Sequence, residues 1–110
     1  MSSPKKSTDD LKQDKPRVET PSDRYLKALS LRNFEDVDII KHEIKSGNIL
    51  IIRVTALAEK SVDDVKRAVN ELNECAKSVG GDIARLGEER IVVTPSWIKI
   101  WRRNPQQYQI

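Results

Sequence analysis

The chain has one cysteine and one histidine, Cys75 and His42, in 110 residues. An intramolecular disulfide needs a second cysteine, and a zinc site or a Cys-x-x-Cys redox pair needs several such side chains. All three are therefore excluded, and the sequence predicts no metal ion and no other cofactor. A lone thiol fits a reducing compartment, so the cytoplasm is the expected location.

Residues suited to catalysis are scarce as well. A nucleophile–base pair would have to use His42, which lies among lysines and glutamates and is expected to be a solvated helix residue. Cys75 stands between Glu74 and Ala76, where a half-buried structural thiol is expected. The glycines of GGDIARLG lead into a predicted strand rather than a helix, so they lack the helical amides that bind phosphate. We therefore predict that the chain is not an enzyme.

Long apolar runs and an excess of one charge are also missing. No run approaches the roughly 18 apolar residues that span a bilayer, and no leader sequence is recognisable. The 20 basic and 17 acidic residues leave a formal charge of only +3. A nucleic-acid partner is therefore allowed but not required. With 34% charged and 37% hydrophobic residues, 110 residues are enough for one soluble domain with a modest core.

The composition changes along the chain. Residues 1–24 contain three of the five prolines and few large apolar side chains. Such a segment cannot bury enough surface to offset its ordering entropy, and it has no apolar stripe at helical spacing. We expect a disordered tail without an amphipathic membrane helix, a globular domain over residues 25–103, and a short tail over residues 104–110.

The first half of the domain has the pattern strand, helix, strand. Residues 25–32 are a plausible strand. Residues 33–47 have apolar side chains at helical spacing, with Asn33 as a candidate N-cap and Gly47 just past the end. Residues 48–55 include four consecutive aliphatic residues, which is typical of a strand in the middle of a sheet.

The second half begins with the most regular helical pattern, over residues 61–79. Ser61 and Asp64 form a predicted capping box, and Gly80 is the expected left-handed residue at the C-terminal end. Residues 82–94 then have the pattern of a β-hairpin with a polar turn. Residues 96–101, SWIKIW, alternate and are expected to form a last strand.

This order, β-α-β-α-β-β(-β), predicts an α+β fold: a two-layer sandwich with two helices on one face of a four- or five-stranded sheet. The other face stays open. If Ile98 and Ile100 pack under the helices, Trp97 and Trp101 lie on the open face, and a homodimer would cover them. Alternatively, the tryptophans cap the edge of the monomer's own core. The residues expected at the dimer contact are Val65, Val69, Leu72, Trp97 and Trp101.

The segment GGDIARLGEERIVVTP, after a long capped helix and an aliphatic strand, resembles the core of the SepF family of cell-division proteins. The resemblance spans about residues 26–100, and the short strands and high charge are more similar to the archaeal branch. The residues that carry it are Gly80, Gly81, Ile83, Arg85, Gly87, Ile91, Thr94 and Pro95.

This resemblance implies a dimer at the division septum that anchors or organises FtsZ filaments by binding the C-terminal peptide of FtsZ. By position, it implies that Arg85 and Ile91 contact that peptide in an apolar groove near the dimer contact. If they do not, the surface around Lys66, Asn70 and Asn73 is the next candidate.

The chain departs from the family pattern in two places. The family's N-terminal membrane helix has no counterpart in residues 1–24, so direct membrane tethering is not expected of this chain. Glu74 lies near a position where bacterial members often have a glycine at a helix–helix contact. A plain dimer is therefore expected rather than bacterial-style polymers.

A second interpretation is an Alba-like dimeric nucleic-acid-binding protein, which has a similar order of elements. Such a protein concentrates basic residues on one face and in an extended hairpin. Here the hairpin turn carries Glu88 and Glu89, which would repel phosphate. Lys99, Arg102 and Arg103 are the only compact basic group. The sequence therefore favours the FtsZ-binding interpretation.

Overall fold

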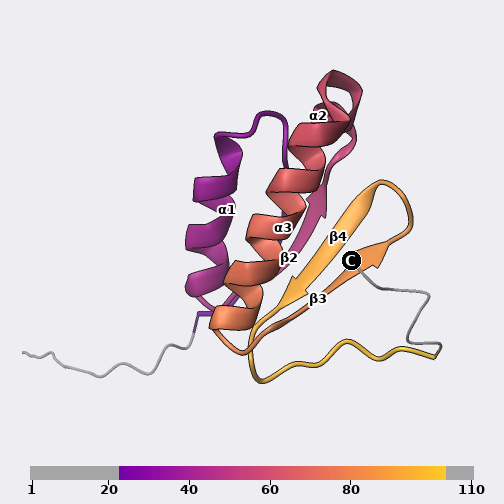
Figure 1. Ribbon diagram of the computed structural model, residues 1–110. Helices are drawn as coiled ribbons and strands as arrows, with labels where there is room; N and C mark the ends of the chain where they lie inside the picture. Colours follow the sequence, from indigo (N-terminus) through magenta and orange to yellow (C-terminus); the bar gives the residue numbers. More distant parts are fainter. Residues whose placement is uncertain (1–22, 104–110) are drawn as a thin grey trace, which may run out of the picture.

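The computed structural model describes residues 23–103, in which helices cover one face of a four-stranded sheet (Figure 1). Nearly all of the tail expected over residues 1–24, and the whole tail expected over residues 104–110, lie outside the described residues. The elements are β1 (Leu26–Ser30), α1 (Asp36–Lys45), β2 (Ile49–Arg53), α2 (Thr55–Lys60), α3 (Val62–Ser78), β3 (Asp82–Leu86) and β4 (Arg90–Thr94).

The strands are ordered β1-β2-β4-β3, so β2 is central, as its aliphatic run predicts. β1 pairs with β2 in parallel, and β4 pairs in the antiparallel sense with both β2 and β3. β1 and β3 are therefore the two edges of the sheet. The two-layer α+β sandwich predicted from the order of elements is confirmed.

The long helix α3 begins and ends where its sequence predicts. The Ser61 hydroxyl accepts a hydrogen bond of 3.1 Å from the Asp64 amide, which satisfies one of the unpaired amides of the first turn. At the other end Gly80 has a φ of 75° and donates its amide to the Lys77 carbonyl. Gly80 is thus the left-handed residue that its position predicted.

Two local features differ from the prediction. In α1 the Asn33 side chain is not the cap; instead, the Asp36 carboxylate accepts from the amides of Arg32 and Asn33 at 3.0 and 3.1 Å. The short helix α2 was not predicted at all. It buries only Leu57, and one large apolar side chain in six residues gives no helical periodicity to recognise.

The core lies between the helices and the sheet. It is built mainly from aliphatic side chains. Every second residue of a strand and one side of each long helix point into it. The least exposed large side chains, all below 2% exposed, are Leu31, Val37, Ile40, Leu50, Ile52, Leu57, Leu72, Ile91 and Val93.

Steric constraints explain the glycine pair between α3 and β3. A side chain at Gly81 would place its Cβ 2.2 Å from the carbonyl oxygen of Thr94, on the neighbouring strand β4. That separation is far below van der Waals contact. Gly80 provides the left-handed turn, and Gly81 allows the chain to enter β3 against the backbone of β4.

The register divides the sheet residues between its two faces. Leu50 and Ile52 of β2 face the helices, and residues paired across strands point to the same side. The open face therefore carries the alternate positions. Its apolar members away from the C-terminal segment are the exposed or half-buried side chains of Leu26, Ala28, Ile49, Ile51 and Val92.

The fifth strand predicted over residues 96–101 is wrong. Pro95 follows β4, the Ile98 amide bonds back to the Pro95 carbonyl, and residues 98–102 have no ladder hydrogen bonds. The alternation of exposure is nevertheless as the sequence predicts. Ile98 and Ile100 are half-buried, whereas Trp97 and Trp101 are 56% and 77% exposed.

Side chains rather than a β-ladder hold this C-terminal segment. Thr94 donates its hydroxyl to the Ile98 carbonyl at 2.7 Å. Asp82 accepts from the Ile100 amide at 2.9 Å and from two guanidinium nitrogens of Arg102 at 3.0 and 3.1 Å. Thr94 and Asp82 are register partners on the open face of the sheet, so the segment crosses that face at the start of β3.

These contacts lower the pKa of Asp82. The hydrogen bond from Arg102 is the main cause, and the amides of Ile100 and Ile83 add to it, so that the pKa falls from 3.8 to about 2. Each of these donors stabilises the ionised carboxylate.

Because the pKa of Asp82 is lower in the folded chain, its stabilising effect is complete above about pH 4 and is lost as the pH falls towards 2. We predict that the wild type loses about 1–2 kcal/mol more unfolding free energy than Asp82→Asn between pH 5 and pH 2, after allowance for solvent screening. Urea unfolding followed by circular dichroism measures both slopes. Equal acid sensitivity in the two proteins would show that the Asp82 contacts are energetically neutral.

Candidate partner-binding site

A groove of about 340 Å³ lies between the first half of α3 and the edge strand β3. Two apolar side chains, two polar or charged side chains of the helix, and one arginine of the strand line it. They are Val65, Lys66, Val69, Asn70 and Arg85. The groove therefore combines an apolar floor with hydrogen-bond donors, which is the usual composition of a small binding site.

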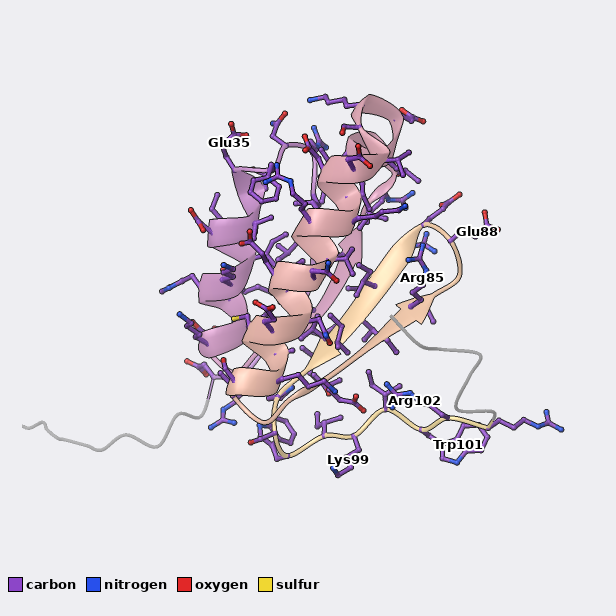
Figure 2. All side chains as sticks on the ribbon, viewed as in Figure 1. Glu35, Arg85, Glu88, Lys99, Trp101 and Arg102 are labelled. Atoms are coloured by element: carbon purple, nitrogen blue, oxygen red, sulfur yellow. The ribbon has the colours of Figure 1, made fainter. Side chains whose placement is uncertain are left out.

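The sheet register places Arg85 in this groove. Arg85 is paired with Ile91 of β4, whose side chain lies in the core, so Arg85 also points to the helix-covered side. It stands near the end of β3, close to the turn that carries Glu88 (Figure 2). Arg85 is half-buried there.

The outer edge of β3 adds backbone groups to the site. The Ile83 carbonyl accepts a hydrogen bond of 2.9 Å from Arg102, so it points away from β4. In an antiparallel pair the outward-pointing residues alternate, and the amide and carbonyl of Arg85 therefore point outward too. A strand laid beside β3 would find a donor and an acceptor at Arg85.

The structure corrects the expected role of Ile91. The family resemblance implied that it contacts the peptide directly, but its side chain is 1% exposed and belongs to the core. Ile91 lies across the ladder from Arg85 and packs inside the sandwich. It can influence the site only through the strand that supports Arg85.

The five residues expected at the dimer contact do not form one surface. Leu72 is 0% and Val69 6% exposed, so both pack mainly inside a single chain. Val65 lines the groove at the start of α3, whereas Trp97 lines a different cleft with Val79. Val65 lies in the first turn of α3 and Val79 directly follows its last turn, so the two are 14 residues or about 20 Å apart.

The alternative surface on the helix and the expected arginine turn out to belong together. Lys66 and Asn70 were expected as a separate site, yet both face Arg85 across the groove. Asn73 does not line it. The sequence signal that was missed is the pair Val65 and Val69, four residues apart, which form the apolar floor beside Arg85.

Neither a metal-binding cluster nor a membrane-spanning helix is found in the described part of the chain. No group of three or more His, Cys, Asp or Glu side chains is close enough to hold a metal ion within residues 23–103. In the same range no helix is long and apolar enough to cross a membrane.

Residues 27–100 match the family described as cell division protein SepF. The cell division protein SepF of Haloferax volcanii is 33% identical over 69 residues, which cover 63% of this chain and 58% of that protein. The chain therefore spans less than two thirds of the length of this curated relative.

Solved structures from archaea are similar as well. A SepF-like protein from Pyrococcus furiosus is 29% identical with a TM-score of 0.64, over 76% of this chain and 100% of the other. A SepF-like protein from Archaeoglobus fulgidus is 30% identical with a TM-score of 0.66, over 73% and 95%.

A third structure shares the fold at lower identity. It is the cell division protein SepF from Methanobrevibacter smithii in complex with FtsZ-CTD, with a TM-score of 0.63 and 14% identity over 72% of this chain and 99% of that one. The family match does not support the Alba-like interpretation. With two thirds of its length matched by the family model, the chain belongs to the SepF family of cell division proteins.

Proposed function

We propose that this chain is a cell-division adaptor that binds the C-terminal peptide of FtsZ in the groove between α3 and β3. The observation that carries the proposal is the groove itself, in which an apolar floor, an arginine and an outward-pointing strand edge occur together. Membership of the SepF family supports it, and so does the FtsZ complex of the related protein from Methanobrevibacter smithii.

Each part of the groove suits an extended peptide. Val65 and Val69 offer apolar contact to an anchoring side chain. The backbone of Arg85 offers hydrogen bonds to a strand added at the edge of the sheet. The Arg85 guanidinium offers charge-assisted hydrogen bonds to a carboxylate or carbonyl oxygen, which are stronger than those between neutral groups.

The proposal includes a homodimer formed through the open face of the sheet. Leu26 is 65% exposed, and Ile49, Ile51 and Val92 are half-buried on the same face. Apolar side chains gathered on one side of a two-layer fold are typical of a symmetric contact between copies. Because the groove opens on the helix side, a dimer of this kind leaves both peptide sites accessible. We place this dimer in the cytoplasm, at the division site.

We predict that Arg85→Glu weakens binding of the cognate FtsZ peptide at least tenfold, which corresponds to about 1.4 kcal/mol. The substitution removes the cation and adds a like charge where the peptide supplies oxygen atoms. Calorimetric titration of the full chain with the C-terminal FtsZ peptide measures the effect. The half-exposed position of Arg85 implies a melting temperature close to that of the wild type.

The matched control is Arg32→Glu, because Arg32 is an exposed arginine in the β1–α1 loop, away from the groove. It makes the same change in charge and is expected to leave the affinity unchanged. If Arg85→Glu bound the peptide as tightly as the wild type, the site would lie elsewhere. Equal losses in both variants would indicate a non-specific effect of net charge.

We also predict that Ile51→Glu converts the dimer into a monomer, since it places a charge in the middle of the open face. Multi-angle light scattering should give a mass of about twice the chain's 12.6 kDa for the wild type and close to that value for the variant. Ile39→Glu is the control, because Ile39 is 62% exposed on α1, on the other side of the molecule. A monomeric wild type at micromolar concentration would contradict the dimer.

A further inference from the structure

The C-terminal segment, residues 96–103, presents a row of large side chains to solvent. Trp101 is 77% exposed, more than any other large apolar side chain in the described part of the chain, and Trp97 is 56% exposed. Lys99 and Arg103 are exposed at the alternate positions between and after them. We define Trp97, Lys99, Trp101 and Arg103 as the Trp–Lys face.

This face is held in place by the opposite side of the same segment. Arg102 points back to β3, where it binds Asp82 and the Ile83 carbonyl, and the Ile100 amide binds Asp82. Figure 2 shows Lys99 and Trp101 projecting away from the domain, on the side of the segment opposite to Arg102. These hydrogen bonds fix the segment against β3, with its tryptophans on the outer side.

The charge on and around the face has one sign over a long stretch. Residues 96–103 contain two arginines, one lysine and no acidic residue. Arg102 is neutralised by Asp82, which leaves Lys99 and Arg103 beside the indoles.

Further cations lie next to Trp97. The Arg24 guanidinium stands 5.5 Å from the centre of the Trp97 ring. Arg24, Lys45 and Trp97 also line a cleft of about 220 Å³ where α1 ends. The cationic surface therefore continues from the Trp–Lys face to the point at which the described chain begins.

We propose that the Trp–Lys face is a contact surface for an anionic lipid bilayer. Tryptophan is enriched where proteins meet the headgroup region, because the indole has an apolar body and a polar N–H. Exposed lysine and arginine beside it attract anionic headgroups and keep their charges in water. The core of a protein–protein interface is depleted in lysine, so alternating Trp and Lys suits a bilayer better than a second copy.

The Trp–Lys face and the groove share no residue, so lipid contact through the face does not depend on the proposed peptide site. The Trp–Lys face also differs from an amphipathic helix, because its segment is extended and would bind the bilayer through two indole rings and two cationic side chains. Contact with a neutral bilayer should consequently be weak, and an anionic one should be required.

The test uses the full chain with vesicles of phosphatidylcholine alone or with 30% phosphatidylglycerol, in 100 mM salt. The chain's two tryptophans both lie in the face, so their emission reports on it alone. We expect co-sedimentation and a blue shift of the emission with anionic vesicles only. Lys99→Glu/Arg103→Glu and Trp97→Ala/Trp101→Ala should each lower the partition coefficient about tenfold or more.

Matched controls are Lys77→Glu and Ile39→Ala, which change an exposed lysine and an exposed apolar residue on the helices. Both should bind vesicles as the wild type does. Trp97→Ala/Trp101→Ala should keep the wild-type affinity for the FtsZ peptide, so a failure here is distinguishable from a failure of the peptide site.

Four outcomes would overturn the inference. The wild type could stay unbound with both vesicle types, or the face variants could bind as tightly as the wild type. A blue shift that rises with protein concentration in the absence of lipid would show instead that a second copy covers the tryptophans. Equal responses to duplex DNA and to anionic vesicles would reduce the face to a general polyanion site.

Discussion

The packing of α3 on the sheet is the contact on which the rest of the structure depends. Ala68, Leu72 and Ala76 have no exposed surface, and their stripe lies against the inward side chains of the sheet. The small alanines bring the helix axis close to the strands. The same packing fixes both walls of the groove, since Val65 and Val69 continue the stripe towards the free edge of the sheet and Arg85 stands on β3 beside them.

Much of this could be predicted from the sequence, because local signals and tertiary contacts agree in α3, β2 and the hairpin. The capping serine and the left-handed glycine are local, and they set the ends of α3. The strand predicted over residues 96–101 is absent, because the exposure of these residues alternates but the segment does not pair with another strand. Asp82, Thr94 and Arg102 hold it by side-chain hydrogen bonds, which no periodicity in the sequence reveals.

Only part of the candidate site could be predicted from the sequence. Arg85 could be named from the family resemblance, but whether Ile91 faces a partner or the core depends on which side of the sheet the helices cover. A strand residue's parity is visible in the sequence, whereas the choice of face is a property of the whole fold. The roles that we propose for the groove and for the open sheet face both depend on that choice.

The central claim is that the groove between α3 and β3 holds the FtsZ peptide, and nuclear magnetic resonance tests it most directly. Amide resonances of the labelled chain would be followed while the unlabelled peptide is added. The account predicts that the largest shifts fall on Val65, Lys66, Val69, Asn70 and Arg85, with little change at Leu26, Ile51 and Val92 on the open face. Shifts centred on the open face, with the groove residues unmoved, would contradict it.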